Sequence, residues 1–191
     1  MSIDVNNAGL PKQVNQGYSK LWYCDADDSE IDLDTLKTTK DLRTVSWLKN
    51  AGGIFENSIT SETDVSEGDV YRDDDGNIVD RADSTSTKTI SAGLLEYATE
   101  KGLELMYADS VYTVDGGTGN VWVEGDLKPS NKFLVREYAV KNKIHRFIWP
   151  NATHNSTVVE AENDSLARAT VSYTALSDGS GNAEYFAAIA K

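Results

Sequence analysis

The chain has 191 residues, of which 39% are hydrophobic, and a formal net charge of −13. This length predicts one domain with a real core, and the excess of acid excludes a surface built to grip nucleic acid or an anionic membrane, because such surfaces are basic. The single cysteine, Cys24, excludes an internal disulfide framework, and without a signal pattern or a long apolar run we expect synthesis in the cytoplasm.

The first part of the chain predicts an arm, short strands and acidic connections. Residues 1–18 are polar and are expected to form an N-terminal arm. Leu21–Cys24 predicts a short strand, and residues 25–34 form an acidic connector that carries too much charge to pack. Residues 54–63 alternate in polarity and predict a strand with Glu56 on its polar face.

A long acidic excursion and a helix are predicted next. The excursion covers residues 64–86, and its centre at 71–79 is typical of a hairpin tip. Lys88–Leu94 alternates and predicts a strand with its apolar residues inward. Apolar residues then recur at three-four spacing over about 95–108, which predicts a helix, although Gly102 weakens it by roughly 1 kcal/mol relative to alanine.

The strongest β signal is the stretch 133–150, in which two runs rich in β-branched and aromatic residues flank a short polar link. Both faces of this predicted hairpin are largely apolar, so we expect it inside a sandwich or closed barrel. Trp149-Pro150 is expected to end it, because proline cannot donate to a ladder. Residues 158–162, 168–176 and 184–190 predict further strands.

Together these elements predict a mainly β fold. Many short strands, one good helix and no internal repeat favour a β-sandwich or barrel with one accessory α-helix and a long hairpin or loop. We expect a single domain at residues 19–191, preceded by the arm at 1–18.

Residues that bear catalytic chemistry form no recognisable set. His145 and His154 are the only histidines, and His145 lies in a predicted strand, where a packed role is favoured. Cys24 precedes an acidic run, which raises the pKa of a thiol and makes it a poor nucleophile. Asp73–Asn77 has spaced acids like a calcium loop, but its glycine stands in the fourth position instead of the sixth, so a hairpin turn is favoured. We expect no catalytic residue, no metal and no cofactor.

A series of short segments carries a family resemblance. The segments are Trp47, Gly52-Gly53-Ile54, the strand Thr87–Leu94 running into Leu95-Glu96-Tyr97, the central hairpin with its Trp149-Pro150-Asn151-Ala152 corner, and Tyr173–Asp178 with its Gly179-Ser180-Gly181 turn. In this order and spacing, over roughly residues 45–185, they resemble the major tail tube protein of long non-contractile-tailed bacteriophages, especially those of actinobacterial hosts.

The resemblance implies a structural virion protein of the tail, made and assembled in the host cytoplasm. In that family a β-sandwich flanked by a helix forms hexameric rings, the rings stack into a tube, and inner strands close into one barrel. An acidic lumen repels DNA phosphates, so double-stranded DNA passes during ejection without specific binding. The implied partners are further copies of the chain and the tape measure, tail terminator and tail tip proteins, with no membrane contact.

Within this hypothesis, charge assigns roles to particular residues. The candidates for a lumen-facing acid are Glu56, Glu62, Glu67 and Asp69. The candidates for an inter-ring contact are Asp73, Asp74, Asp75 and Asn77. The candidates for a basic inter-subunit surface are Lys128, Lys132, Arg136, Lys141, Lys143 and Arg146. The charges either serve solubility alone or pair an acidic excursion with a basic surface on a neighbouring copy, which would fix register and orientation.

Two other classes of function stay open. A capsid-decoration or head–tail joining subunit would share this composition and these strands without polymerising axially. A carbohydrate-binding sandwich would stack a sugar on an exposed tryptophan, with Trp22, Trp47, Trp122 and Trp149 as candidates. An enzyme is disfavoured, because no catalytic set is present.

Overall fold

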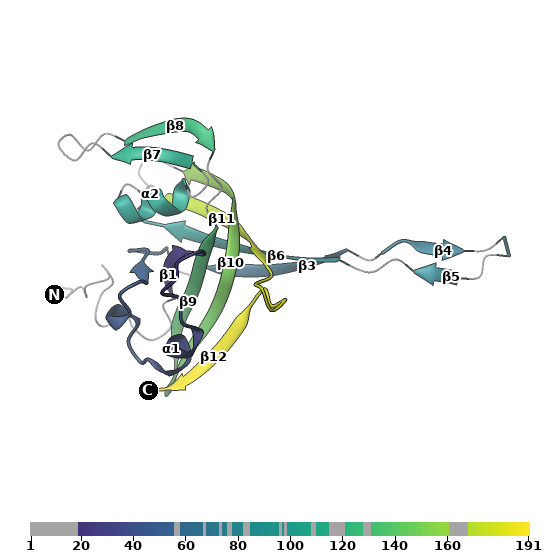
Figure 1. Cartoon of the computed structure of the whole chain (residues 1–191), viewed down its shortest axis with the longest axis horizontal. Helices are drawn as coiled ribbons and strands as arrows, with labels where there is room; N and C mark the ends of the chain where they lie inside the picture. Colours follow the sequence, from purple (N-terminus) through teal and green to yellow (C-terminus); the bar gives the residue numbers. More distant parts are fainter. Residues whose placement is uncertain are drawn as a thin grey trace.

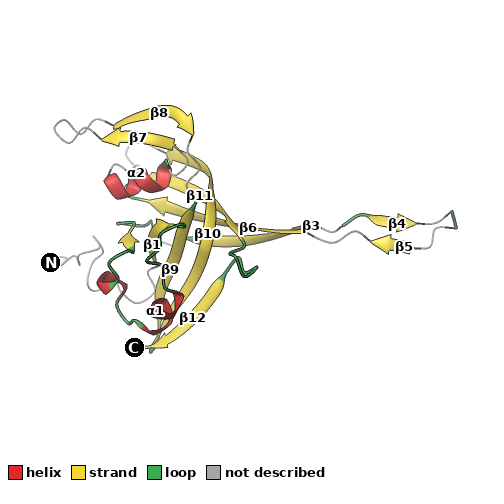
Figure 2. Ribbon diagram, viewed as in Figure 1, coloured by secondary structure: helices red, strands yellow, loops and turns green. Residues whose placement is uncertain are grey.

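Antiparallel strands make up most of the computed structural model (Figure 1, Figure 2), which confirms the mainly β prediction. The structure describes residues 19–55, 58–66, 68–72, 74–75, 78–81, 85–95, 97, 99–107, 110–114, 121–127, 131–160 and 168–191. The predicted arm at 1–18 lies outside these residues. Across the part of the chain described, no helix has the length and apolar character needed to span a membrane.

One sheet of eight strands organises the fold. In spatial order its strands are β2 (Lys49–Asn50), β1 (Lys20–Asp25), β9 (Lys132–Val140), β10 (Lys143–Glu160), β11 (Arg168–Leu176), β6 (Thr85–Leu94) and β3 (Thr60–Ser66), and β12 (Tyr185–Ala190) also pairs with β10. Two further ladders are antiparallel pairs, β4 (Val70–Arg72) with β5 (Ile78–Arg81), and β7 (Ser110–Val114) with β8 (Val121–Leu127).

The predicted central hairpin is confirmed as β9 and β10. The two strands pair from Val140 opposite Lys143 inward, around a turn at Lys141 and Asn142. Lys141 has a positive φ of 51°, in the left-handed region that two-residue hairpin turns require.

Strand β10 continues past the predicted end of the hairpin and joins the two parts of the sheet. Its residues 143–148 pair with β12, and its residues 151–160 pair with β11. Pro150 falls between these partners, where the register against β9 also shifts. The expectation that Trp149-Pro150 ends the strand is therefore wrong, because a proline is tolerated at a bulge that needs no N–H in the ladder. The strand predicted at 158–162 is the far end of β10.

The hydrophobic core has two parts, one on each face of the sheet. On the face that we call the α2 side, the helix α2 (Glu100–Met106) covers a cluster that includes Leu21, Tyr23, Ile90, Leu134, Trp149, Val171 and Tyr173. On the opposite face, the α1 side, helix α1 (Leu33–Thr38) and the 3-10 helix η2 (Leu42–Thr44) cover a cluster that includes Trp22, Cys24, Phe133, Val135 and Ile148. Successive residues of β1 and β9 alternate between the clusters, so both faces of the hairpin are buried where it passes through the core, as predicted. Each large side chain so buried contributes about 1.5–3 kcal/mol.

The acidic connector at 25–34 keeps its acids exposed or half-buried, but Ile31 and Leu33 pack against the core and Asp32 begins a helix. The Asp32 carboxylate caps α1 by accepting the N–H of Asp34 at 2.9 Å, and Asp41 caps η2 by accepting the N–H of Arg43 at 3.1 Å. Leu36 and Leu42 then point into the core and are fully buried. Carboxylates are favoured at these positions, where helix N–H groups have no other partner.

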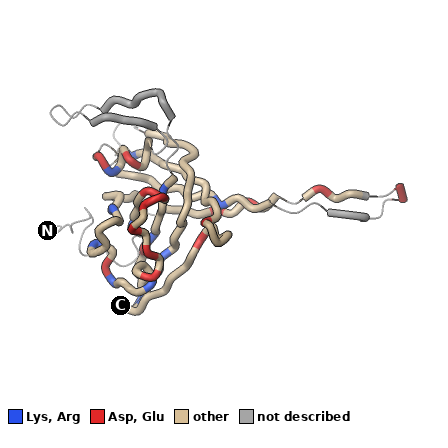
Figure 3. Tube along the Cα trace, in the orientation of Figure 1, with Lys and Arg blue, Asp and Glu red and all other residues tan. Residues whose placement is uncertain are grey.

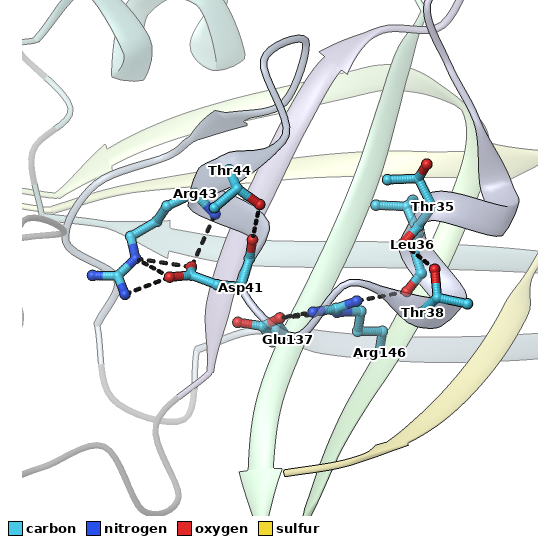
Figure 4. A network of polar contacts seen from close by, with 8 residues as sticks. All are labelled: Thr35, Leu36, Thr38, Asp41, Arg43, Thr44, Glu137 and Arg146. Atoms are coloured by element: carbon cyan, nitrogen blue, oxygen red, sulfur yellow. Dashed lines mark hydrogen bonds and ion pairs between the residues drawn. The ribbon is translucent and has the colours of Figure 1, made fainter.

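A buried arginine ties this cover to the sheet (Figure 4). Arg146 on β10 is 0% exposed, and its Nε donates to Glu137 Oε2 at 2.9 Å while Nη2 forms an ion pair with the same oxygen at 2.8 Å. Its Nη1 donates to the backbone carbonyl of Leu36, in α1, at 2.6 Å. A buried charge requires partners of this kind.

The predicted helix at 95–108 exists but is shorter, as α2. Thr99 sets its start, because its hydroxyl accepts the N–H of Gly102 at 3.2 Å, and the helix begins after this cap. At its other end the buried Tyr173 hydroxyl donates to the Leu105 carbonyl at 2.6 Å. The apolar residues of α2 therefore rest on β11.

The strand predicted at 54–63 begins later, at Thr60. Ile54 makes only an isolated bridge with Leu94, and the Ser58 N–H donates to the Phe55 carbonyl at 3.1 Å in a turn. The turn lies close against Gly93, whose N–H donates to Ser58 Oγ at 3.0 Å. An added Cβ at Gly93 would meet Ser58 at 3.0 Å, so the absence of a side chain allows this close approach.

The excursion at 64–86 forms the predicted hairpin. β3 and β6 pair from Thr60 and Ser91 out to Ser66 and Thr85, and β4 and β5 pair farther along. Figure 1 shows these strands extending far from the rest of the molecule. We call the part beyond the body, residues 64–86, the projecting hairpin.

Candidate assembly surfaces

Strand β3 forms one end of the sheet and is exposed along its length. Among the strands that the structure describes only β6 pairs with it, and all seven of its residues are exposed. Val65, with 64% of its surface exposed, is the large apolar residue of the strand. An edge of this length offers a row of backbone N–H and C=O groups to another chain.

The α1 side of the sheet is open beyond β10. Ile90 packs in the α2-side cluster, so the residues beside it on β6 point to the opposite face. The polar side chains on that face include Glu62, Asp64, Thr87, Thr89, Ser91, Thr170, Ser172 and Thr174, all half-buried or exposed. We call this set the open half. Hydroxyls and carboxylates keep their hydrogen bonds with water, so this surface needs no cover.

The structure places two of the predicted lumen-facing acids. Glu62 lies on the open half, opposite Thr89 of β6, and Asp69 is exposed on the projecting hairpin just before β4. Glu56 and Glu67 lie outside the described residues. Asp64, which the sequence did not single out, lies beside Glu62 on the same face.

Two of the predicted inter-ring residues lie at the far end of the projecting hairpin. Asp74 and Asp75 form an exposed turn there, and Asp73 and Asn77 lie outside the described residues. Tyr71 on β4 is 54% exposed. Figure 3 shows acidic positions along the described part of this hairpin.

The six predicted basic residues do not form one surface. Lys132 and Arg146 are 7% and 0% exposed, with carboxylate partners at Asp25 and Glu137, so they belong to the interior of the chain. That part of the prediction is wrong, because strand alternation turned these two cations inward, where an ion pair compensates each. Lys128 lies outside the described residues.

The other three basic candidates divide between two places. Lys141 and Lys143 are exposed at the β9–β10 turn. Arg136 is half-buried, and its guanidinium lies 5.2 Å from the centre of the Tyr138 ring. Burial lowers the pKa of Arg136 from its usual range.

A groove rich in cations lies beside the β9–β10 turn. It has a volume of about 270 Å³, its cations are Lys20, Lys40, Arg43 and Lys191, and the side chains of Ala139 and Ile144 supply its apolar wall. Tyr138 also lines the groove, but its ring turns to the opposite face of the sheet, against Phe147. Its acids, Asp41 and Glu137, already pair with Arg43 and Arg146. Sequence reasoning missed this groove, because its cations come from β1, η2 and the end of the chain and are far apart in the sequence. We call it the basic groove.

A larger cavity of about 680 Å³ lies on the same side of the sheet and has the opposite charge. Asp27, Asp28 and Asp178 line it together with Phe133 and Pro150. Its character repels an acidic partner.

An aromatic patch lies on the α2 side, away from helix α2. The rings of Tyr138, Phe147 and Phe186 are neighbours, with Phe147 6.2 Å from Tyr138 and 5.1 Å from Phe186 between ring centres. His145 packs edge-on against Tyr138 and Phe186, as expected of a packed histidine. Phe186 is 55% exposed, so part of this patch faces solvent.

The groups capable of covalent or metal chemistry do not converge among the described residues. Burial, together with Asp28 and Asp25, raises the pKa of the Cys24 thiol to about 12, in the predicted direction. The thiol is also 3% exposed and so a poor nucleophile. Within the described part of the chain, no three His, Cys, Asp or Glu side chains are placed to hold a metal ion.

No protein-family model matches the sequence, and a search of curated proteins finds no match.

Proposed function

We propose that this chain is a structural subunit that assembles with its own copies into stacked rings, forming a hollow tube like the tail tube of long non-contractile-tailed bacteriophages. The observation that carries the proposal is β3, an edge strand of seven exposed residues at the end of an eight-stranded sheet. Each backbone hydrogen bond formed with a neighbouring copy would contribute about 0.5–1.5 kcal/mol. A closed ring of copies would remove the exposed edge altogether.

The open half supports its use as the lining of such a tube. Glu62 and Asp64 lie on a face on which hydroxyl side chains predominate, and the whole chain carries a net charge of −13. An acidic, water-covered wall repels phosphate, and at roughly 0.1 M salt its field extends about 10 Å into the bore. Double-stranded DNA would pass without adhering. Six-fold rings, a place in the virion tail, and contacts with tape measure, terminator and tip proteins follow from the sequence resemblance.

A capsid-decoration or head–tail joining subunit is the second candidate, since an exposed edge also serves a single closed ring. The projecting hairpin favours the tube, because it extends far from the body and offers a contact between successive rings. A carbohydrate-binding role has less support. Trp22 and Trp149 are 2% and 0% exposed, and Trp47 packs edge-on against Phe133, with 5.8 Å between ring centres.

Negative-stain electron microscopy of the purified chain at rising concentration tests the proposal. We expect filaments with a central channel. Discrete rings would support the second candidate, and a monomer that persists at high concentration would overturn both.

Two matched proline variants test the role of the β3 edge. Adjacent residues of a strand direct their N–H groups to opposite sides. Of two variants, one with proline at Ser61 and one with proline at Glu62, one therefore loses an N–H donor that faces β6 (inward), and the other loses an N–H donor at the free edge (outward). The variant that loses the outward donor should fold like the wild type and form no tubes. The other should weaken pairing with β6. If both variants assemble normally, the β3 edge is not the joint between subunits.

A further inference from the structure

The basic groove has the charge and the shape to bind an acidic partner. The described residues provide no carboxylate within ion-pair distance of Lys20, Lys40 or Lys191, while Asp41 and Glu137 are neutralised by arginines. Lys141 and Lys143 add positive charge at its border, because the N–H of Lys191 donates to the carbonyl of Asn142 in the same turn. The apolar wall at Ala139 and Ile144 adds a surface for one large side chain.

The end of the projecting hairpin has the complementary character. Asp74 and Asp75 are exposed there, and Tyr71, with an exposed ring, lies on the adjoining strand β4, which Asp69 precedes. Tyrosine is common at the centre of protein interfaces, because it has a large rigid ring with a polar tip. The surrounding carboxylates would steer it to cations.

The hairpin and the groove of one molecule cannot meet. Figure 1 shows the hairpin pointing away from the body, on the side opposite the C-terminus, and the groove includes Lys191 at that terminus. A contact between the two therefore needs a second copy, and it joins unlike surfaces, so it propagates head to tail. The larger cavity is a poor receiver for the same hairpin, because Asp27, Asp28 and Asp178 would repel its acids.

We infer that the projecting hairpin of one copy docks in the basic groove of the next copy, with Tyr71 against Ala139 and Ile144 and with Asp74 and Asp75 near Lys20 and Lys40. This inference rests on the proposed function, in which it supplies the contact between successive rings.

A charge exchange tests the pairing. The groove variant is Lys20→Glu with Lys40→Glu, and the hairpin variant is Asp74→Lys with Asp75→Lys. Each alone should elongate roughly tenfold less than the wild type or worse, and an equal mixture of the two should recover elongation. The matched control, Asp27→Lys with Glu30→Lys, changes exposed acids elsewhere and should elongate normally. Normal elongation of either test variant, or no recovery on mixing, overturns the inference.

Disulfide trapping between full-length chains tests the contact independently of tube formation. Asp74→Cys chains mixed with Lys40→Cys chains should form a crosslinked dimer under mild oxidation, and Asp74→Cys mixed with Asp27→Cys should not. The native Cys24 does not interfere, since it is buried. A crosslink without tubes would support the docking of the hairpin in the groove and would refute the proposed function as a tube subunit. Tubes without the crosslink would retain the proposed function and refute this docking site. Binding of duplex DNA in the groove in place of a second chain would also overturn the inference.

Discussion

The α1 side of the sheet has two halves that differ in what they present. Across β1 and β9 it carries Trp22, Phe133 and Val135, and α1 and η2 cover these side chains. Across β6 and β11 it carries hydroxyls such as Thr89 and Ser172, and these are not fully buried. The same sheet is therefore covered by a core on one half of this side and exposed to solvent on the other half. Side-chain chemistry alone determines which half needs a cover. The open half is stable in water as it is, whereas the β3 edge still has backbone groups that can pair with another chain.

The covered half should be the more fragile, and Arg146→Ala should have the largest effect on folding. The substitution removes the ion-pair partner of Glu137, whose side chain is 13% exposed, and removes a hydrogen bond to α1. We expect a loss of about 3–5 kcal/mol in the free energy of unfolding, measured by urea denaturation. Arg146→Met with Glu137→Leu removes both charges together and should recover most of that loss. An Arg146→Ala variant as stable as the wild type would show that the ion pair does not hold the cover.

At the edge of the open half, Gly93→Ala should have an intermediate effect. A Cβ there meets the Ser58 Cβ and Oγ at 3.0 Å, in the turn that crosses this face. Overpacking of this kind costs about 1–3 kcal/mol. The double variant Gly93→Ala with Ser58→Gly should be more stable than the sum of the single losses predicts, which a double-mutant cycle measures. Strict additivity would mean that the two side chains do not collide.

The sequence predicted part of this structure and missed the rest. Strand β9 was readable from its run of β-branched and aromatic residues, β11 from apolar residues of period two, and the hairpin at 64–86 was also predicted. The cover on the α1 side was not, because Asp32 and Asp41 act as caps through local hydrogen bonds that composition reads only as charge. The cations of the basic groove meet only through the fold, whereas Lys132 and Arg146 turn inward by strand phase.

Reversing charge on the open half should leave stability nearly unchanged and alter its behaviour toward DNA. Glu62→Lys with Asp64→Lys replaces exposed side chains, so the free energy of unfolding should shift by no more than about 0.5 kcal/mol. Assembled tubes of this variant should retain a short DNA duplex and protect it from nuclease, whereas wild-type tubes should not bind it. Asp27→Lys with Glu30→Lys serves as the matched control and should leave bound duplex open to nuclease. If the open-half variant also leaves the duplex accessible, these two acids do not line the bore.

The smallest expected effect is a loosening of the covered half in acid. Hydrogen bonds from Thr35 and Asp34 hold the pKa of Asp32 below its usual value, and Arg43 does the same for Asp41. A carboxyl with a lowered folded pKa stabilises the fold above its unfolded pKa of 3.8, and that stabilisation is lost as the pH falls through the folded value. Asparagine caps a helix without titrating. Urea denaturation should therefore show a smaller loss of stability between pH 5 and pH 3 for Asp32→Asn with Asp41→Asn than for the wild type. Equal losses for the variant and the wild type would show that carboxyls other than Asp32 and Asp41 cause the acid sensitivity. The covered half would then be no more sensitive to pH than the open half.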